Sequence, residues 1–453
     1  MLENGQIKEV EIIDLNHTVQ GVAKIDNFVV FIDKAIKGDL VEIEIKEKKK
    51  NFAVGKLLKI IEPSKDRINP PCGYFYECGG CQLMHMDYNA QLIYKKNRVI
   101  NEMRRNSVNM EDAVVNDTIG MENPFRYRNK TAFSVAKKNK EIIIGPYEQG
   151  TYNTVNISNC MLQSNEADKT VRLFKELMIK CNIEAYDKKT EKGTVRNIVI
   201  RNNRQNELML VIVTATENFP NKDIIIKELT SNIKEIKTVV QNINSKNTNL
   251  VMGHKNITLY GEGTINDNIG DLIFTISPET FFQINPEQTE KLYNTAIEYA
   301  NISKDDVCFD IYCGIGTISL MAAKYAKKVY GVEIVEQSII NARENAVKNN
   351  IVNAEFFTGK AEKLLPKLYS KNIKADVVIV DPPRKGCEQE VIDTIISMSP
   401  KKVVYVSCNP STLARDIKLL ESGGYQLKKV QTVDQFPWTH HVECVVLITR
   451  KDR

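Results

Sequence analysis

A single cysteine, Cys408, stands between a buried apolar run and a helix start in the stretch VVYVSCNPSTLARDI, residues 403–417. The apolar, β-branched run predicts a buried strand, and Pro410 followed by Leu413 and Ile417 predicts the first turns of a helix. Open α/β sheets bind ligands at the carboxyl ends of their strands. Cys408 is therefore a candidate nucleophile, and the dipole of the following helix is expected to favour its thiolate.

Two acidic residues end other predicted strands. Glu333 closes the stretch DVCFDIYCGIGTISLMAAKYAKKVYGVE, which also contains the glycine loop 313–316, and Asp381 ends the run ADVVIVD ahead of two prolines. Glycines let the backbone approach a nucleoside, and an acidic residue about 20 positions on can accept hydrogen bonds from ribose hydroxyls. A dinucleotide site or a ligand-free packing turn is an alternative. However, Ser319 replaces the third glycine of the dinucleotide fingerprint, and the Gly-Lys-Ser/Thr of a P-loop is missing.

A thiol, a carboxylate and a nucleoside loop suit methyl transfer to carbon 5 of a pyrimidine. Addition of a thiolate to carbon 6 makes carbon 5 nucleophilic towards a sulfonium methyl group, and a general base then removes the proton from carbon 5. The stretch QFPWTHHVECVVLITR offers three candidate bases: Glu443, His440 and His441. A glutamate entering a buried strand is costly unless it is paired or used, but spacing alone does not choose among the three.

A cysteine-rich stretch, PCGYFYECGGCQLMHM, follows Pro70–Pro71. Cys72, Cys78 and Cys81 have the spacing C-x5-C-x2-C, and Cys160 lies far downstream. Four thiolates suit zinc or an iron–sulfur cluster, and the spacing by itself favours zinc, with His85 able to replace one ligand. The other cysteines of the chain are expected to be core or bystander thiols.

Length and composition place these residues in a soluble protein of two to four domains, at about 150 residues per domain. The chain has 453 residues, 42% of them hydrophobic, and a net charge of +5, which permits a polyanionic partner. No apolar run approaches the roughly 20 residues of a membrane span, and the N-terminus lacks a signal-peptide core. We therefore expect a cytoplasmic protein without a membrane partner, in which the 10 cysteines stay reduced.

Three regions differ in their hydrophobic pattern. Residues 8–63 show short strands separated by turns, which predicts a small β-barrel. A helix with several basic residues is expected over 89–106, and residues 123–265 are mostly strands, with one helix near 168–180. After the stretch ISPETFFQIN, residues 276–285, a helix leads into alternating strands and helices, which predicts a doubly wound, parallel α/β sheet.

Five motifs occur together and in order: FFQIN, DIYCGIGT, VDPPRKG, VSCNPSTLARD and HHVE. As a set they resemble the RNA (uracil-5-)-methyltransferase family over nearly the whole chain. The resemblance implies that Cys408 is the nucleophile, that Glu443 is the base, and that Gln283, Tyr312, Glu333 and Asp381 contact S-adenosylmethionine. Thr317 and Lys360 occupy two further contact positions where the sequence follows the family less faithfully.

The resemblance also implies a metal centre and a domain plan. In the family, this cysteine spacing binds a [4Fe-4S] cluster, here through Cys72, Cys78, Cys81 and Cys160, which reverses the preference for zinc. The barrel resembles a TRAM domain, an OB-like RNA-binding module. The expected plan is a TRAM barrel over 1–65 and a central iron–sulfur and RNA-binding domain over 66–90 and 123–265. A Rossmann-like methyltransferase domain is expected over 91–122 and 266–453.

The RNA substrate is expected to be 23S ribosomal RNA, because the TRAM module accompanies that branch of the family. The alternatives are the T-loop uridine of tRNA, a cytosine-5 methylation, and a non-catalytic iron–sulfur protein that binds RNA. Pro383 stands where cytosine-5 enzymes usually carry a cysteine, which argues against that activity.

Side chains near the motifs are candidate RNA contacts. Phe281, Phe282 and Trp438 are candidates for stacking on a flipped uracil, with core packing as the alternative. Phosphate contacts are expected from basic residues that share short segments: Arg126, Arg128, Lys130, Lys95, Lys96, Arg98, Arg104 and Arg105.

Overall fold

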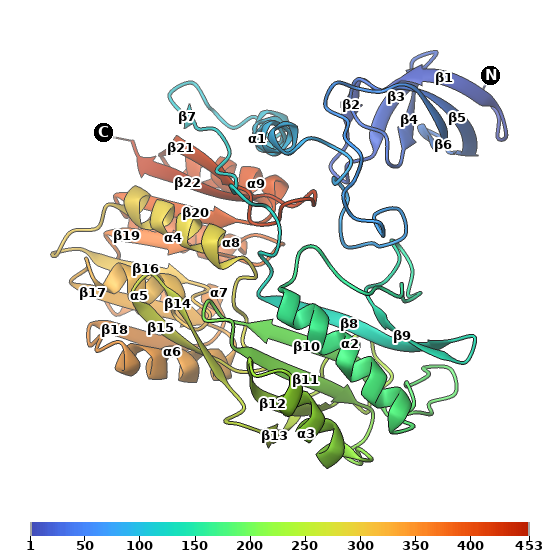
Figure 1. Ribbon diagram of the computed structural model, residues 1–453. Coiled ribbons are helices and arrows are strands. Elements are labelled where there is room, and N and C mark those ends of the chain that lie inside the picture. Colours follow the sequence, from blue (N-terminus) through green and yellow to red (C-terminus); the bar gives the residue numbers. More distant parts are fainter. Residues whose placement is uncertain (1, 452–453) are drawn as a thin grey trace.

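The computed structural model describes residues 2–451 and shows three regions joined along the chain (Figure 1). The first is a six-stranded sheet that curls around its own core, in the order β1-β5-β6-β4-β3-β2. Its strands are β1 (Ile7–Glu11), β2 (Asp14–Leu15), β3 (Gly21–Ile25), β4 (Phe28–Ile32), β5 (Leu40–Lys48) and β6 (Phe52–Glu62). In β5 the alternating sequence LVEIEI buries Val41, Ile43 and Ile45 on one face, as the period of a strand requires.

Helix α1 (Tyr88–Arg105) and strand β7 (Val114–Val115) follow the cysteine-rich stretch. Asp87 caps α1 by accepting hydrogen bonds from the backbone N–H groups of Asn89 and Ala90. Helix α1 packs against a helix near the C-terminus, and β7 joins the edge of the C-terminal sheet. This segment therefore lies beside residues more than three hundred positions away in sequence.

A second six-stranded sheet forms the centre of the chain, in the order β13-β12-β11-β10-β8-β9. Its strands are β8 (Lys130–Lys138), β9 (Glu141–Gly145), β10 (Val195–Asn202), β11 (Leu208–Thr214), β12 (Ile236–Ile243) and β13 (Lys255–Tyr260). Helices α2 (Asn165–Lys180) and α3 (Lys222–Asn232) pack on it. Helix α3 was not expected, because its run of three isoleucines, 224–226, has the β-branched composition of a strand.

The hairpin β14 (Ile265–Ile269) and β15 (Leu272–Ile276) leads into an eight-stranded sheet, in the order β18-β17-β16-β19-β20-β22-β21-β7. The remaining strands are β16 (Val307–Ile311), β17 (Lys328–Glu333), β18 (Ala354–Thr358), β19 (Val377–Val380), β20 (Lys402–Ser407), β21 (Tyr425–Val433) and β22 (Glu443–Arg450). Strand β22 runs antiparallel between β20 and β21, while the other neighbours pair in parallel. The expected doubly wound α/β fold is confirmed, with one antiparallel strand that was not anticipated.

Helices cover both faces of this sheet (Figure 1). They are α4 (Pro286–Ala300), α5 (Thr317–Ala323), α6 (Glu336–Lys348), α7 (Ala361–Ser370), α8 (Gln389–Met398) and α9 (Pro410–Ser422). Two separate apolar cores result, one on each face of the sheet. Within residues 2–451, none of the helices combines the length and the apolar character needed to cross a bilayer.

Candidate active site

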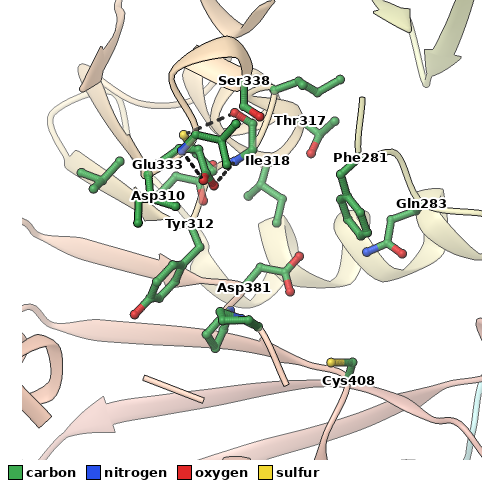
Figure 2. Close-up of a pocket in the computed structure, with 18 of the residues that line it drawn as sticks. Phe281, Gln283, Asp310, Tyr312, Thr317, Ile318, Glu333, Ser338, Asp381 and Cys408 are labelled. Carbon is green, nitrogen blue, oxygen red and sulfur yellow. Dashed lines mark hydrogen bonds between the residues drawn. The ribbon is translucent and has the colours of Figure 1, made fainter. Parts of the chain in front are cut away.

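A cavity of about 620 Å³ opens at the carboxyl ends of β16, β17, β19 and β20. The strand order reverses beside β16, and such a switch point is where open α/β sheets bind ligands. All six residues expected to bind the cofactor or act in catalysis line this one cavity: Gln283, Tyr312, Glu333, Asp381, Cys408 and Glu443. In Figure 2, Asp381 lies between Cys408 on one side and the Glu333 and Tyr312 group on the other.

The glycine loop and the end of β17 form one wall of the cavity. The Gly314 N–H donates to Glu333 Oε2 at 3.3 Å, and the Val335 N–H donates to Oε1 at 2.9 Å. Gly316 has a φ of +83°, and a Cβ atom there would come within 3.1 Å of the Phe356 ring. The two hydrogen bonds orient the Glu333 carboxylate. The missing side chain at Gly316 lets the loop pack closely against the Phe356 ring, as in other nucleoside-binding loops.

Asp310 lies in β16, and Tyr312 directly follows this strand. Tyr312 has a φ of +71°, a strained conformation for a tyrosine, and its N–H donates to Val332 O at 2.8 Å. Asp310, which the motif analysis did not single out, is fully buried and also lines the cavity. Its Oδ2 accepts a hydrogen bond from Ser319, but its Oδ1 has no hydrogen-bond partner among the residues that the structure describes. Burial raises the pKa of Asp310 to about 7.

Asp381 and Gln283 approach the cavity from different regions. Burial, together with the charge of Asp310, raises the pKa of Asp381 to about 7. Gln283 lies in the segment before α4, and its carbonyl oxygen accepts a hydrogen bond from Asn129 Nδ2 at 2.9 Å. The central sheet therefore helps to place one side of the cavity. Thr317 and Lys360, whose positions follow the family pattern less closely, line the same cavity.

Cys408 and Glu443 are brought together by the antiparallel strand β22. The last pair of facing residues between the antiparallel strands β20 and β22 is Ser407 and Cys444. Cys408 and Glu443 are the next residues along the two strands. Burial raises the pKa of the Cys408 thiol to about 11, and the carboxylates of Glu443 and Asp381 add to this effect. Burial, with the charge of Asp381, also raises the pKa of Glu443 well above its usual value.

The α9 dipole, which was expected to favour the Cys408 thiolate, is opposed in the free protein by burial and by the carboxylates of Glu443 and Asp381. A helix dipole contributes about 0.3–1 kcal/mol at an exposed site, and here burial and two nearby carboxylates outweigh it. Arg384 acts in the opposite direction, because its charge lowers the pKa of both Cys408 and Glu443. Arg384 also lines the cavity, and its place in the motif VDPPRKG was the signal that could have identified it.

The two histidines before Glu443 differ in position. His441 lines the cavity, whereas His440 is not among the lining residues. Burial lowers the pKa of His441 to about 3 and that of His440 to about 4, so both imidazoles are neutral near pH 7. Of the three candidate bases, the structure therefore places two, Glu443 and His441, at the cavity.

The three aromatic residues expected to stack on a flipped uracil differ in their exposure to solvent. Phe281 lines the cavity and is 72% exposed, so its ring is free to meet a ligand. Phe282 also borders the cavity, but it is buried and its ring packs against Phe274. Trp438 is 4% exposed and stacks on Phe125, with 5.0 Å between the ring centroids. Stacking on a base is therefore retained for Phe281 alone, while Phe282 and Trp438 belong to the core.

Several basic residues expected to contact phosphates are used internally instead. Arg126 donates to the carboxylate of Asp168 at 2.7 Å and to two backbone carbonyls. Arg128 lies beside the Cys81 and Cys160 thiols. Lys95 is fully buried and ion-paired with Asp434. The alternation of basic and aromatic residues in this region thus reflects internal packing.

A second hollow, of about 590 Å³, lies between the barrel and the cysteine-rich stretch. Its lining includes four lysines: Lys34, Lys46, Lys56 and Lys59. Tyr76, from the cysteine-rich stretch, also lines it and is 63% exposed. A basic groove with an exposed aromatic ring has the composition of a single-stranded nucleic-acid site. We call it the lysine groove.

The four predicted metal ligands gather in one region. Cys72, Cys81 and Cys160 pack against one buried cluster, and the charges of Cys72 and Cys160 help to raise the pKa of Cys78, after burial. The Gly80 N–H donates to Cys78 Sγ at 3.3 Å. Among residues 2–451, however, no three His, Cys, Asp or Glu side chains have the spacing of a preformed metal site.

Comparison with known proteins shows the family to which this chain belongs. The family model described as tRNA (Uracil-5-)-methyltransferase matches residues 87–451, and the TRAM domain model matches residues 2–58. An uncharacterized RNA methyltransferase of Clostridium acetobutylicum is 46% identical over 447 residues, which cover 98% of this chain and 97% of the relative. A protein with the same description from Halalkalibacterium halodurans is 44% identical, with coverage of 100% and 98%.

A solved structure agrees over the whole length. The tRNA (uracil-54, C5)-methyltransferase of Pyrococcus abyssi, in complex with S-adenosyl-L-homocysteine, has a TM-score of 0.79 and 25% identity. The alignment covers 98% of this chain and 100% of that one. These matches confirm the family resemblance and the N-terminal TRAM domain. The chain belongs to the tRNA (uracil-5-)-methyltransferase family.

Proposed function

We propose that this protein transfers the methyl group of S-adenosylmethionine to carbon 5 of a uridine in RNA, through a covalent adduct with Cys408. The observation that carries the proposal is the meeting of Cys408 and Glu443 at one end of the cavity whose other end holds Glu333. The Pyrococcus abyssi structure, with its bound S-adenosyl-L-homocysteine, supports the choice of methyl donor.

The chain's residues divide the reaction between them. As the thiolate, Cys408 adds through Sγ to carbon 6, and the ring electrons shift onto carbon 5. Carbon 5 then attacks the sulfonium methyl group that S-adenosylmethionine supplies, and S-adenosyl-L-homocysteine leaves. Glu443 takes the proton from carbon 5, and the electron pair of that bond re-forms the double bond and expels the Cys408 thiolate. A raised pKa makes Glu443 a stronger base once it is ionised.

The cavity also suggests how each substrate is held. Glu333, with its carboxylate fixed by two backbone N–H groups, is placed to accept the ribose hydroxyls of the donor. Tyr312, Gln283 and Asp381 line the path from Glu333 to Cys408. Phe281 offers an exposed ring for stacking on the flipped uracil.

The RNA that we propose is 23S ribosomal RNA, on the basis of the TRAM barrel. Transfer RNA is the second candidate, because the matching Pyrococcus abyssi enzyme is named for uracil 54 of tRNA. The test is methylation by the purified enzyme of deproteinised 23S ribosomal RNA and of total tRNA, both from cells lacking this gene, followed by mass mapping of 5-methyluridine. Incorporation into tRNA alone would overturn the ribosomal assignment and leave the chemistry intact.

We further propose a [4Fe-4S] cluster on Cys72, Cys78, Cys81 and Cys160. The gathering of four thiols, the N–H donor to Cys78 Sγ and the positive charge of Arg128 beside Cys81 and Cys160 suit a set of thiolate ligands. Anaerobically purified protein is expected to be brown and to contain about four irons per chain, and Cys160→Ser should lose them. Colourless protein with one zinc would contradict the assignment.

A further inference from the structure

The segment 434–442, which joins β21 to β22 and leads directly into Glu443, is unusually buried for a connection. Asp434, Gln435, Trp438 and Thr439 are each at most 4% exposed. The segment also supplies Phe436 and His441 to the cavity. Connections normally lie on the surface, because a buried backbone needs partners for its polar groups. Those partners come from two segments far away in sequence.

One side of the segment is held by a stripe on α1. Lys95 Nζ donates to the Asp434 carboxylate and to Phe436 O, the latter at 3.0 Å. Arg98, one turn further along, donates to His440 O. Gln91, one turn earlier, accepts from the Trp438 N–H at 3.2 Å. Residues at i, i+4 and i+7 share one face of a helix, so a single face of α1 contacts both ends and the middle of the segment.

The other side is held by the cysteine-rich stretch. The N–H groups of Gln82 and Leu83, directly after Cys81, both donate to Trp438 O at 2.9 Å. Trp438 itself has a φ of +68°, and its indole N–H donates to Pro124 O at 2.8 Å. Gln91 also donates to Leu83 O at 3.2 Å, which joins α1 to the cysteine-rich stretch. Trp438 thus combines a strained backbone with hydrogen bonds through its N–H, its carbonyl oxygen and its indole, so its conformation is fixed by the surrounding structure.

We propose that α1 and residues 82–83 form a clamp that positions the segment 434–442, and through it the Glu443 carboxylate, against the adduct on Cys408. Lys95 is its positioning residue on α1, and Trp438 is the residue of the segment that α1, residues 82–83 and Pro124 all hold. The inference rests on the proposed function and assigns the clamp to one step of it, the removal of the proton from carbon 5. A loosened clamp leaves thiol addition and methyl transfer in place, and it slows proton removal, so that a methylated protein–RNA adduct accumulates.

The test uses full-length protein with RNA substrate and methyl-labelled S-adenosylmethionine. Lys95→Met/Asp434→Asn removes both charges together, which avoids leaving a buried unpaired carboxylate. Trp438→Phe keeps an aromatic ring and removes the N–H that bonds Pro124. Asn97→Ala is the matched control, because Asn97 lies on α1 two residues after Lys95 and is exposed. Glu443→Gln reports separately on the proposed chemistry.

The expected result is a fall in kcat of roughly 10- to 100-fold in both clamp variants, with a several-fold rise in labelled adduct on denaturing gels. The Kd for S-adenosylmethionine should stay within about twofold, and Asn97→Ala should behave as wild type. Trp438 is the chain's single tryptophan, so a red shift of its emission in Lys95→Met/Asp434→Asn would report loosening directly.

Two results would overturn the clamp. One is unchanged turnover in both clamp variants. The other is a parallel loss of turnover and donor binding without adduct, which would show a general structural role. If Glu443→Gln also fails to accumulate adduct, the assignment of the base in the proposed function is wrong, and the two failures are thereby told apart.

Discussion

Cys408 and Glu443 are cross-strand neighbours at the β20–β22 edge, one step beyond the Ser407–Cys444 pair. This relationship depends on β22 running antiparallel, because only then does the start of β22 meet the end of β20. Glu443 is buried and Cys408 is partly buried, and the Glu443 carboxylate helps to raise the pKa of the Cys408 thiol. The free site therefore holds a protonated thiol beside its proposed base, and the entry of the substrate has to shift this balance.

Replacement of Cys408 by alanine should abolish both turnover and the covalent RNA adduct. Binding of S-adenosylmethionine should persist, with a Kd within about threefold of wild type, because Glu333 and the glycine loop remain intact. Adduct on denaturing gels and donor binding by calorimetry measure the two effects. Cys181→Ala is the matched control, since Cys181 is a partly exposed thiol outside the cavity and should leave both turnover and adduct intact. An adduct that survives Cys408→Ala would exclude this residue as the nucleophile.

Glu443→Gln should give the opposite outcome, an adduct that accumulates. The amide keeps the size of the side chain but cannot take the proton, so thiol addition and methyl transfer proceed while elimination stalls. Denaturing gels should show labelled RNA bound to the protein, with multiple turnover reduced by at least about 100-fold. His441→Gln provides the comparison, because His441 also lines the cavity. Accumulation in His441→Gln, with normal turnover in Glu443→Gln, would transfer the role of base to the histidine.

The raised pKa of Cys408 predicts a distinctive pH profile for its alkylation. Its pKa is raised to about 11, first by burial and then by Glu443 and Asp381, so only a small fraction is thiolate near pH 8. Since the thiolate is the reacting form, the rate of modification by iodoacetamide in the free protein should rise about tenfold per pH unit between roughly pH 8 and 10. An ordinary cysteine, with a pKa of about 8.5, would approach a plateau in that range.

Peptide mass mapping would follow Cys408 separately from the other thiols. Glu443→Gln should increase the rate near pH 8, because it removes one of the carboxylates that oppose the thiolate. A plateau below about pH 9 in the wild type would show instead that the helix dipole and Arg384 dominate at this site.

The sequence predicted the residues of the cavity well, because their placement follows from local patterns. Cys408, Asp381 and Glu333 each end an apolar run, and the carboxyl ends of parallel strands meet at one edge of a sheet. The antiparallel direction of β22 could not be predicted in this way, since an apolar strand pattern is the same in both directions. The partnership of Cys408 with Glu443 therefore depended on the family resemblance until the structure provided its geometry.

The burial of charged side chains was a second feature that could not be predicted from the sequence. Lys95 and Arg98 looked like an RNA-binding face, because the helical pattern does not show which charges are buried. The partner of Lys95, Asp434, lies 339 positions away, and only the folded chain brings the two together. Likewise, the pKa of Cys408 could be judged from the sequence only through the dipole of the following helix. Its burial and its proximity to Asp381, which both raise this pKa, arise from tertiary structure.

The lysine groove offers a test of how RNA outside the target site is held. Lys56 and Lys59 are exposed and line the groove beside Tyr76. Each contact with a phosphate of single-stranded RNA contributes about 0.7 to the slope of log K against log salt. Lys56→Ala/Lys59→Ala should therefore reduce the magnitude of that slope by about 1.4 and raise the KM for RNA, while kcat at saturation stays unchanged.

Binding measured by fluorescence anisotropy across a salt series gives this slope directly. Lys8→Ala/Lys24→Ala is the matched control, because both lysines are exposed on the same barrel and outside the groove. Equal slopes for the two double variants would show that the barrel attracts RNA only through its overall charge. A reduced slope confined to the groove variant would place the RNA backbone between β6 and the cysteine-rich stretch, on the side of the molecule where Cys72, Cys78 and Cys81 lie.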